Sequence, residues 1–468
     1  MSLATVFPPG GKSGSEVTLT VAGSALEEID RLHFSHPGIT AAKKPEANAF
    51  AVTIGAEVPV GIYDVRVAGR QGISNPRVFV VGHLPEGVEA KANNQPDAAV
   101  ELANGSVFNG TVPAAAREFF KISAKKGERL VVECAAGELD SRLSPVLAIL
   151  DSMGKEISRG GGLLDFVAPA DGDYRLQLHD LAFAGGPEYF YRLTLTNGPH
   201  VDFLFPAAGL PGTKSRFTLF GRNLPGSTPE MGLEKLEVEI ELPASHDSRA
   251  DGLGLPASAV IDGFSYRFNG VANPRFIAFA ASPVIQEQEP NNRPAEAQPL
   301  PVPCEVAGRF YPAADSDSFT FEAKKGEVYW IEVFSSRSGV PTHPFLLVQH
   351  DKGVPQESYG SDVNAGGTRF NTAGGDPVVR FEVKEEGLHR ILVRDLFGGT
   401  RNDPRGVYRL VVRRETPDFR LAAIVEFPPS KPDDRAAVPR ASLLHGGGTS
   451  AVRVIALRQD NFNGEIAL

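Results

Sequence analysis

The feature that most constrains this chain is an internal duplication, in which short motifs recur 198 or 199 residues later. Four motifs recur in register: Phe7–Gly11 as Phe205–Gly209, Asn75–Arg77 as Asn273–Arg275, Asn93–Asn94 as Asn291–Asn292, and Ala124–Glu128 as Ala323–Glu327. A repeat of about 200 residues is too long for a solenoid unit and is typical of two small domains. The sequence therefore predicts a two-domain unit that occurs twice.

Apolar and polar residues alternate within short runs of the first half of the repeat. Val17, Leu19 and Val21 alternate with threonines, and residues Tyr63 to Val67 follow the same period of two. This period predicts strands with one buried face. A module of roughly 85 residues built from such strands and turns indicates an immunoglobulin-like sandwich. The second half of the repeat has the same pattern, so we expect an all-β chain of tandem β-sandwich modules.

Five modules follow from the repeat and from the positions of its turns. We expect immunoglobulin-like sandwiches at 1–82 and 199–284, a second kind of sandwich at 83–198 and 285–415, and a third immunoglobulin-like module at 416–468. The last module ends in two strand-like runs, VRVIAL and GEIAL, and no residue follows Leu468 to close the second. A strand left there would present an unpaired edge. We therefore expect this module to be truncated and the natural chain to be longer.

Composition excludes some classes of partner. The formal net charge is −10, so no basic footprint predicts binding to nucleic acid. No apolar run approaches the ~18 residues of a membrane helix, so we expect no membrane span. Two cysteines, Cys134 and Cys304, are too few for a disulfide framework or a four-cysteine zinc site. The N-terminus has neither the basic start nor the apolar stretch of a signal peptide.

The second half of each repeat resembles the bacterial pre-peptidase C-terminal domain, or PPC domain. The better copy carries the motif residues Glu287–Asn292, Val306–Gly308, Asp315–Phe319, Lys325–Glu327, Gly387–Asp395 and Tyr408–Leu410. The first copy, Glu86 to Thr196, is degenerate but keeps Asn93–Asn94 and Lys126–Glu128. The first half of each repeat looks like the TIG-type immunoglobulin-like module that often precedes PPC domains.

This resemblance implies a jelly-roll β-sandwich attached to a secreted bacterial peptidase or another exported enzyme. It implies an extracellular, periplasmic or cell-surface location, although the chain itself shows no export signal. Modules similar to this one bind collagen or carbohydrate, so a polysaccharide or an extracellular matrix-type protein is the expected partner. The resemblance supplies no catalytic residues.

Oxygen-bearing side chains gather in the better copy and predict a calcium site. Glu287, Glu289, Asn291 and Asn292 lie on one short segment, and Asp315 and Asp317 lie on a loop that enters a strand. Hard cations prefer several carboxylate and carbonyl oxygens, and alternate residues of an extended segment share a face. In similar collagenase modules calcium lies between such a segment and such a loop. The alternative is that these acids cap turns and solvate a linker.

The first copy offers an internal comparison for this calcium site. At the corresponding positions Glu289 is replaced by Lys91, Asp315 by Ala116 and Asp317 by Glu118. Losing carboxylates and gaining a lysine weakens a cation site, so we expect calcium in the second copy alone.

Trp330, the only tryptophan, is a candidate ligand-binding residue together with Glu332. Aligned on the lysine turn, Tyr329 and Ile331 occupy the inward face of a strand, which places Trp330 and Glu332 on the other face. An indole beside a carboxylate can stack on a sugar ring or anchor a protein partner. The alternative is that a loop or a neighbouring module covers the indole.

Enzyme motifs are absent from the sequence. It contains no His-Glu-x-x-His zinc motif and no Gly-x-Ser-x-Gly nucleophile elbow. We therefore expect a non-catalytic binding or accessory segment of a larger secreted bacterial protein. A structural stalk without a ligand is one alternative, and an enzyme with an unrecognised site is another.

Overall fold

The computed structural model describes residues 1–70, 72–244, 261–268, 271, 274–351, 357–367, 370–425, 449 and 451–468. Strands dominate these residues, and helix is confined within them to the 3-10 turns η1 (Pro96–Ala98), η2 (Gly137–Leu139), η4 (Pro294–Glu296) and η5 (Ser336–Ser338). None of the described helices is long and apolar enough to span a bilayer. The predicted all-β fold of tandem sandwiches is confirmed. The chain forms two compact units, one built on Met1–His200 and the other on Val201–Arg267, Pro274–Val438 and Val452–Leu468.

The first sandwich lies in the first unit and has two sheets, ordered β1-β3-β6-β5 and β2-β9-β7-β4, with β8 paired to β7. Leu19, Val65 and Phe79 are fully buried between the sheets, while Thr18 and Thr20 are exposed, as the period of two predicts. The strands are β1 (Ser2–Phe7), β2 (Gly10–Lys12), β3 (Glu16–Ser24), β4 (Ile29–Phe34), β5 (Ile39–Lys43), β6 (Ala49–Ile54), β7 (Gly61–Gly69), β8 (Gly72–Ile73) and β9 (Arg77–Gly82).

The second sandwich also lies in the first unit and packs two five-stranded sheets, ordered β10-β12-β19-β14-β17 and β11-β13-β18-β15-β16. Its core includes Leu130 and Val132 from one sheet and Leu176 and Leu178 from the other. The strands are β10 (Glu86–Val88), β11 (Val100–Glu101), β12 (Ser106–Thr111), β13 (Glu118–Ala124), β14 (Arg129–Ala135), β15 (Pro145–Leu150), β16 (Glu156–Gly160), β17 (Leu163–Val167), β18 (Gly172–Asp180) and β19 (Phe190–Thr196).

The third sandwich lies in the second unit and has sheets ordered β20-β22-β24-β23 and β21-β26-β25. Phe203, Phe205 and Phe220 pack with Ala307 and Val407 of the next sandwich, so an apolar cluster joins the two. The described strands are β20 (His200–Phe205), β21 (Ala208–Gly209), β22 (Lys214–Arg222), β23 (Thr228–Glu230), β24 (Leu233–Glu241), β25 (Gly263–Tyr266) and β26 (Arg275–Phe279).

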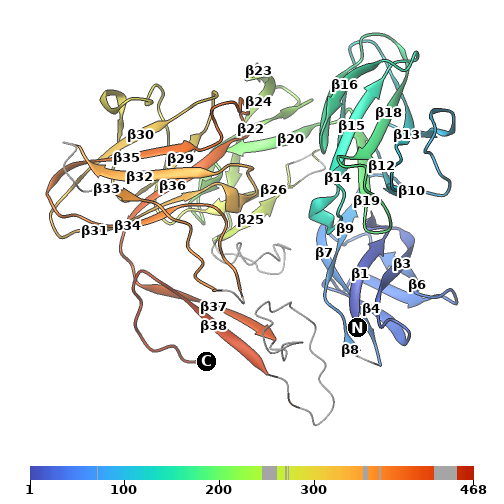
Figure 1. Cartoon of the computed structure of the whole chain (residues 1–468), viewed down its shortest axis with the longest axis horizontal. Coiled ribbons are helices and arrows are strands. Elements are labelled where there is room, and N and C mark those ends of the chain that lie inside the picture. The colour runs from blue at the N-terminus through green and yellow to red at the C-terminus, as the bar shows by residue number, and fades with distance from the viewer. Residues whose placement is uncertain are drawn as a thin grey trace. The chain divides into compact units, whose positions relative to one another are not determined.

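The fourth sandwich repeats the topology of the second strand for strand, in the orders β27-β29-β36-β31-β34 and β28-β30-β35-β32-β33 (Figure 1). The duplication read from the sequence is therefore also a duplication of sheet topology. The strands are β27 (Val284–Gln286), β28 (Gln298–Pro299), β29 (Cys304–Arg309), β30 (Asp317–Ala323), β31 (Val328–Phe334), β32 (Pro344–His350), β33 (Glu357–Tyr359), β34 (Val378–Glu382), β35 (Gly387–Asp395) and β36 (Val407–Arg414).

The C-terminal part of the second unit contains the antiparallel pair β37 (Asp418–Val425) and β38 (Val452–Gln459). Residues 426–448 of the expected third immunoglobulin-like module lie outside the described residues, so its truncation stays a prediction. Arg413 of β36 forms an ion pair with Asp460, directly after β38, and Asp460 also accepts a hydrogen bond from the backbone N–H of Thr416 at 2.8 Å. These contacts hold β38 against the fourth sandwich.

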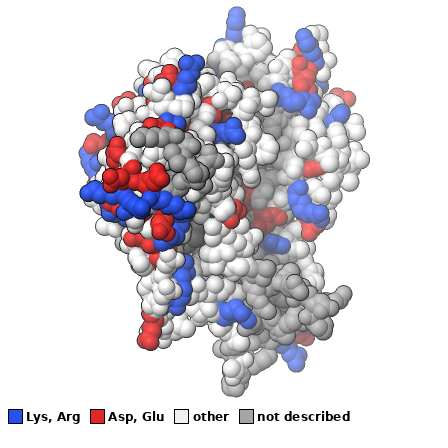
Figure 2. Space-filling view, turned by 60° about the vertical axis from the view of Figure 1, so that its left-hand side comes forward, with Lys and Arg blue, Asp and Glu red and all other residues white. Residues whose placement is uncertain are grey.

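Charged side chains of both signs are interspersed over the face of the molecule in Figure 2. At the left of that view, lysine and arginine side chains lie directly against aspartate and glutamate side chains.

Candidate functional site

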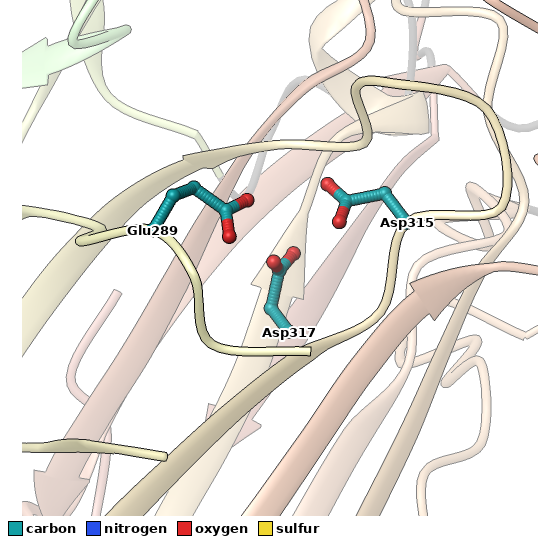
Figure 3. Close-up of side chains that lie close together, drawn as sticks. All are labelled: Glu289, Asp315 and Asp317. Atoms are coloured by element: carbon teal, nitrogen blue, oxygen red, sulfur yellow. The ribbon is translucent and has the colours of Figure 1, made fainter. Parts of the chain in front are cut away.

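Three carboxylates meet at one end of the fourth sandwich. Glu289 follows β27, Asp315 lies in the loop before β30, and Asp317 begins β30 (Figure 3). Each offers a carboxylate oxygen within 4.8 Å of the other two. Within the described part of the chain this is the only group of three or more metal-ligand side chains that converge in this way. The structure thus brings together three of the six residues that the sequence predicted as calcium ligands.

Backbone contacts hold the segment and the loop in place. Ser318 N–H donates to the carbonyl of Asn291 at 3.0 Å, and Ser316 N–H donates to the side-chain oxygen of Asn292 at 3.2 Å. Asp315 accepts hydrogen bonds from the N–H groups of Tyr311 at 3.1 Å and Ser316 at 3.0 Å. Asn292, a predicted ligand, therefore orders the loop through Ser316.

Tyr408 forms the floor of the acidic site. Its hydroxyl donates to Oδ2 of Asp317 at 2.7 Å and lies 3.3 Å from Oε2 of Glu287. A Cβ at Gly308 would lie 2.2 Å from the Tyr408 ring, so the neighbouring strand needs glycine there. Glu287 accepts a hydrogen bond from Arg309 N–H at 2.8 Å. Glu287 therefore belongs to the supporting floor and lies outside the group of three converging carboxylates.

Buried polar atoms without partners lie beside the carboxylates. Asn291 is 0% exposed, and neither its amide nitrogen nor its amide oxygen has a hydrogen-bond partner among the described residues. Oδ1 of the buried Asp317 likewise lacks one. An unsatisfied buried polar group costs free energy, and a bound ion or water is a common explanation.

The carboxylates of the site disfavour one another's charge. Burial, with the charge of Asp315 added, raises the pKa of Glu287 to about 8. Burial and the charge of Glu289 raise the pKa of Asp315 to about 6. Burial and the charge of Glu287 raise the pKa of Asp317 well above its usual range. A cation reverses this effect because it stabilises the ionised carboxylates.

The donor set fits a hard divalent cation. Glu289, Asp315 and Asp317 supply carboxylate oxygens and Asn291 can supply an amide oxygen, which are the ligand types that calcium prefers. With no sulfur or imidazole donor in the group, the set does not suit zinc or copper.

The first copy lacks this convergence. Glu118 takes the place of Asp317 and accepts a hydrogen bond from Tyr191, the counterpart of Tyr408. Burial raises the pKa of Glu118 to about 8. Lys91 is exposed, and Ala116 carries no ligand atom. The amide nitrogen of Asn93 donates to the carbonyl of Phe119 at 3.2 Å, whereas the amide of Asn291 has no such bond.

Trp330 and Glu332 lie on the face of β31 that the sequence predicted. Tyr329 and Ile331 are buried in the core, and Trp330 and Glu332 are half-buried on the opposite face. The guanidinium carbon of Arg413 lies 6.0 Å from the centroid of the indole. Because β38 and its neighbours partly cover this face, Trp330 lines a pocket instead of standing free on a surface.

Two buried ion pairs at the sandwich junctions were missed by the sequence reasoning. In the first unit Arg192 forms two hydrogen bonds with Glu86, at 2.8 and 2.9 Å. In the second unit the corresponding Arg409 pairs with Glu305 at 2.5 Å and reaches the carbonyl of Phe279 in the preceding sandwich at 3.4 Å. The arginine occupies the same strand position in both copies, but its acidic partner lies on a different strand in each. A comparison of matching sequence positions therefore does not reveal the pair.

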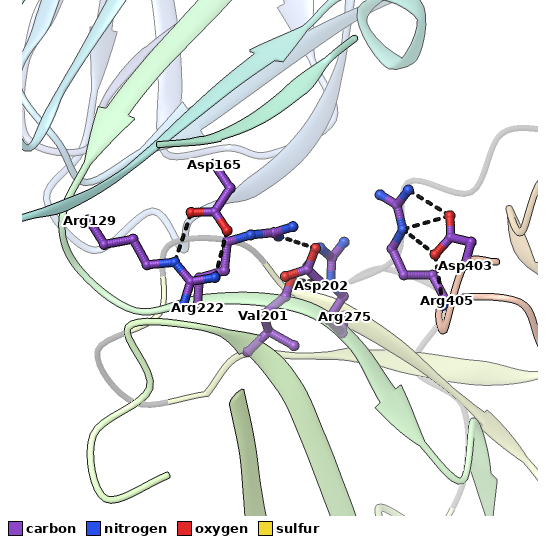
Figure 4. A network of polar contacts seen from close by, with 8 residues as sticks. All are labelled: Arg129, Asp165, Val201, Asp202, Arg222, Arg275, Asp403 and Arg405. Atoms are coloured by element: carbon purple, nitrogen blue, oxygen red, sulfur yellow. Dashed lines mark hydrogen bonds and ion pairs between the residues drawn. The ribbon is translucent and has the colours of Figure 1, made fainter. Parts of the chain in front are cut away.

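Other arginine–carboxylate pairs support the second unit. Asp202 of β20 is buried and pairs with Arg222, and burial raises the pKa of its carboxyl group (Figure 4). Arg275 donates to the carbonyl of Val201 at 2.9 Å, and Arg405 pairs with Asp403 at 2.7 Å.

Comparisons with known proteins give partial structural likenesses. No family model matches the sequence, and no curated protein matches it. The PPC domain of a collagenase from Bacillus anthracis is 20% identical, covers 26% of this chain and all of its own, and has a TM-score of 0.20. SGBP-B of the mixed-linkage glucan utilization locus of Bacteroides ovatus, solved with a mixed-linkage heptasaccharide, is 8% identical over 86% of this chain and 72% of its own, with a TM-score of 0.15.

The fibronectin(III)-like modules of CbhA from Clostridium thermocellum are 13% identical over 41% of this chain and 92% of their own, with a TM-score of 0.15. The solved structures that this chain resembles thus include a PPC domain, at an overall likeness too low to transfer an activity or a ligand.

Proposed function

We propose that the chain is a non-catalytic accessory segment of a larger exported bacterial protein, and that calcium stiffens its fourth sandwich. The observation that supports this function is the convergence of Glu289, Asp315 and Asp317 beside the unpartnered amide of Asn291. A divalent cation would stabilise the ionised form of these three carboxylates, and an extracellular medium supplies calcium at the concentrations that weak sites of this kind require.

Calcium would connect two parts of the chain that meet at the site. Glu289 lies on the segment after β27, a strand already paired with β29 of the fourth sandwich, and Asp315 and Asp317 lie at the start of β30. A shared cation would therefore tie the segment after β27 to the loop before β30 and stiffen this end of the fourth sandwich. Such stiffening suits a segment that holds a binding surface or a catalytic domain at a set distance.

Calcium titration of the full chain by calorimetry tests the metal site. We expect one site with a dissociation constant of ~10⁻⁴–10⁻³ M, as for other extracellular modules, and a raised melting temperature. Asp315→Asn and Asp317→Asn should abolish both effects. Glu118→Gln, the matched change in the first copy, should leave calcium binding unaltered. No heat and no thermal shift in the unmodified chain would exclude the site.

The recognition role requires a second measurement. Co-sedimentation of the full chain with insoluble polysaccharides and with collagen fibres should retain the chain on one of these polymers. Retention would support an accessory binding segment that recognises polysaccharide or extracellular protein. A chain that binds calcium and stays in the supernatant with every polymer is a stalk without a ligand.

A further inference from the structure

A pocket with a volume of about 180 Å³ lies in the second unit, on the face of the fourth sandwich opposite its core. Trp330, Glu332 and Phe334 of β31 form its floor. Residues of β38 and of the loop before β34 form its walls, among them Gln459 and Asp362. The pocket shares no residue with the acidic site.

Arg337 is held rigidly at one side of the pocket. Its Nε donates to Asp376 at 3.1 Å, its Nη2 donates to Glu332 at 2.8 Å, and its guanidinium carbon lies 4.2 Å from the centroid of Phe334. Asp376 has no exposed side-chain surface and also accepts the N–H groups of Ser335 and Ser336 at 3.0 and 2.7 Å. Within the described ranges Nη1 of Arg337 has no hydrogen-bond partner, so it can donate to a ligand.

The opposite wall offers complementary groups. Arg413 is fixed by Asp460, with one contact at 3.0 Å, and lies over the indole of Trp330. The side-chain amide of Gln459 is half-buried and makes no hydrogen bond to the rest of the described chain. This amide provides one free donor and one free acceptor at the pocket.

Charge and size restrict what the pocket can hold. Its charged residues nearly balance, with four acids (Glu332, Asp362, Asp376 and Asp460) against three arginines (Arg337, Arg413 and Arg458). Most of them pair with one another, so neither an anion nor a cation is favoured. The volume is smaller than the ~300–1,000 Å³ typical of pockets for drug-sized ligands.

We infer that this Trp330 pocket binds one neutral sugar residue of a polysaccharide, with the sugar face on the indole and its hydroxyls on Arg337 and Gln459. An aromatic floor with fixed donors and acceptors at its rim recognises a ring that is apolar on its face and polar at its edge. The inference rests on the proposed accessory function and names the ligand class that this function would serve.

The first copy serves as a natural control for the pocket. The positions of Trp330 and Phe334 hold Val131 and Ala135 there, and the position of Arg337 holds Glu138. The second sandwich therefore has neither the aromatic floor nor the fixed guanidinium, so of the two copies only the fourth sandwich carries the inferred sugar site.

The single tryptophan makes the test specific. Because Trp330 is the only tryptophan of the chain, its fluorescence reports on this pocket alone. The full chain is titrated with glucose, galactose, mannose, xylose and N-acetylglucosamine, and with a collagen-like peptide. We expect a saturable change in emission and protection from acrylamide quenching with at least one of the sugars. No response to any sugar, or a response to the peptide alone, would overturn the inference.

Two variants separate binding in the pocket from indirect effects. Gln459→Ala removes one hydrogen-bonding group without touching the core and should weaken the sugar by about fivefold. Val131→Ala, at the matching strand position of the first copy, should leave the titration unchanged. Equal affinity in Gln459→Ala and in the unmodified chain would contradict the assignment of the pocket.

The two proposals can fail separately. If the chain is retained on a polysaccharide but the emission of Trp330 does not change, the inferred sugar site is wrong and the accessory function still holds. Repeating the sugar titration with a chelator shows whether the pocket depends on calcium, and we expect it to respond without calcium because the two sites share no residue.

Discussion

The hydroxyl of Tyr408 donates a hydrogen bond to Asp317 at 2.7 Å, and Tyr191 makes the same contact with Glu118 in the first copy. Each tyrosine lies opposite a glycine in the neighbouring strand, Gly308 or Gly110, which leaves room for its ring. The duplicated fold thus keeps one buried acid on a tyrosine in both copies, and the second copy alone adds the carboxylates of Glu289 and Asp315.

Removing the tyrosine hydroxyl should affect the two copies differently. Tyr408→Phe leaves Asp317 with one donor fewer, and because that hydrogen bond lowers the pKa of Asp317, the variant should bind calcium several-fold more weakly. We expect a loss of ~1–3 kcal/mol in stability without calcium. Tyr191→Phe is the matched control and should cost similar stability without changing calcium affinity, as calorimetry of both variants would show. Equal calcium affinities in the two variants would contradict the role of Tyr408.

Protons should compete with calcium. Among the converging carboxylates, the pKa of Asp315 is raised to about 6 and the pKa of Asp317 is raised well above its usual range, so both hold protons in a weakly acidic solution. Metal ligands must lose these protons, and calcium affinity should therefore rise between pH 6 and pH 8 and fall as the solution is acidified. Calorimetric titrations across this range, in buffers of different ionisation enthalpy, measure both the affinity and the protons released. An affinity independent of pH would mean that these carboxylates do not contact the ion.

Glu118 should make the first unit less stable as the pH rises from about 4.5 to about 8. Its pKa is raised from 4.5 to about 8, so the folded chain keeps a proton that the unfolded chain releases. Stability is full below pH 4.5 and declines as the pH rises towards 8, by at most about 5 kcal/mol at ~1.4 kcal/mol per pKa unit. Glu118→Gln mimics the protonated acid and should remove this decline in scanning calorimetry at pH 5 and pH 8.

A surface acid provides the control for that measurement. Glu156 is exposed, and its ion pair with Arg159 lowers the pKa of its carboxyl group. Glu156 is therefore ionised at both pH values in either state. Glu156→Gln should leave the pH dependence of the melting temperature unchanged, and a similar effect of both substitutions would argue against a specific role of Glu118.

The acidic partner of the junction arginine should be movable, so that the first copy can adopt the arrangement of the second. Glu86→Val leaves Arg192 buried without its partner and should cost about 3–5 kcal/mol. Val107 lies opposite Glu86 in the parallel pair β10–β12, and the corresponding pair in the second unit is Val284 and Glu305. The double variant Glu86→Val with Val107→Glu reproduces the second arrangement and should recover most of the loss in denaturant unfolding. A double variant no more stable than Glu86→Val would show that the acid cannot be moved.

The sequence predicted most of the fold because its information is local and repeated. The alternation at Val17 to Val21 fixes which face of a strand is buried, and the spacing of 198 or 199 residues fixes the number of copies. The alternation also placed Trp330 and Glu332 on the outer face of β31, as the structure confirms.

The site was less predictable because it depends on contacts between distant segments. The convergence of Glu289 with Asp315 and Asp317 agrees with the predicted grouping, but the roles of Glu287 and Asn292 as supports depend on hydrogen bonds to Arg309 and Ser316. The cover over Trp330 comes from β38, more than a hundred residues away in the chain. No periodicity or motif reports such a contact.

The acidic partner of the junction arginine lies on different strands in the two copies, and this difference constrains how the copies diverged. One arrangement has the carboxylate at Glu86 and the other has it at Glu305, and no single substitution converts one into the other. A lineage that lost the first acid before gaining the second would pass through a buried, unpaired guanidinium. A lineage that gained the second acid first would keep the arginine neutralised at every step.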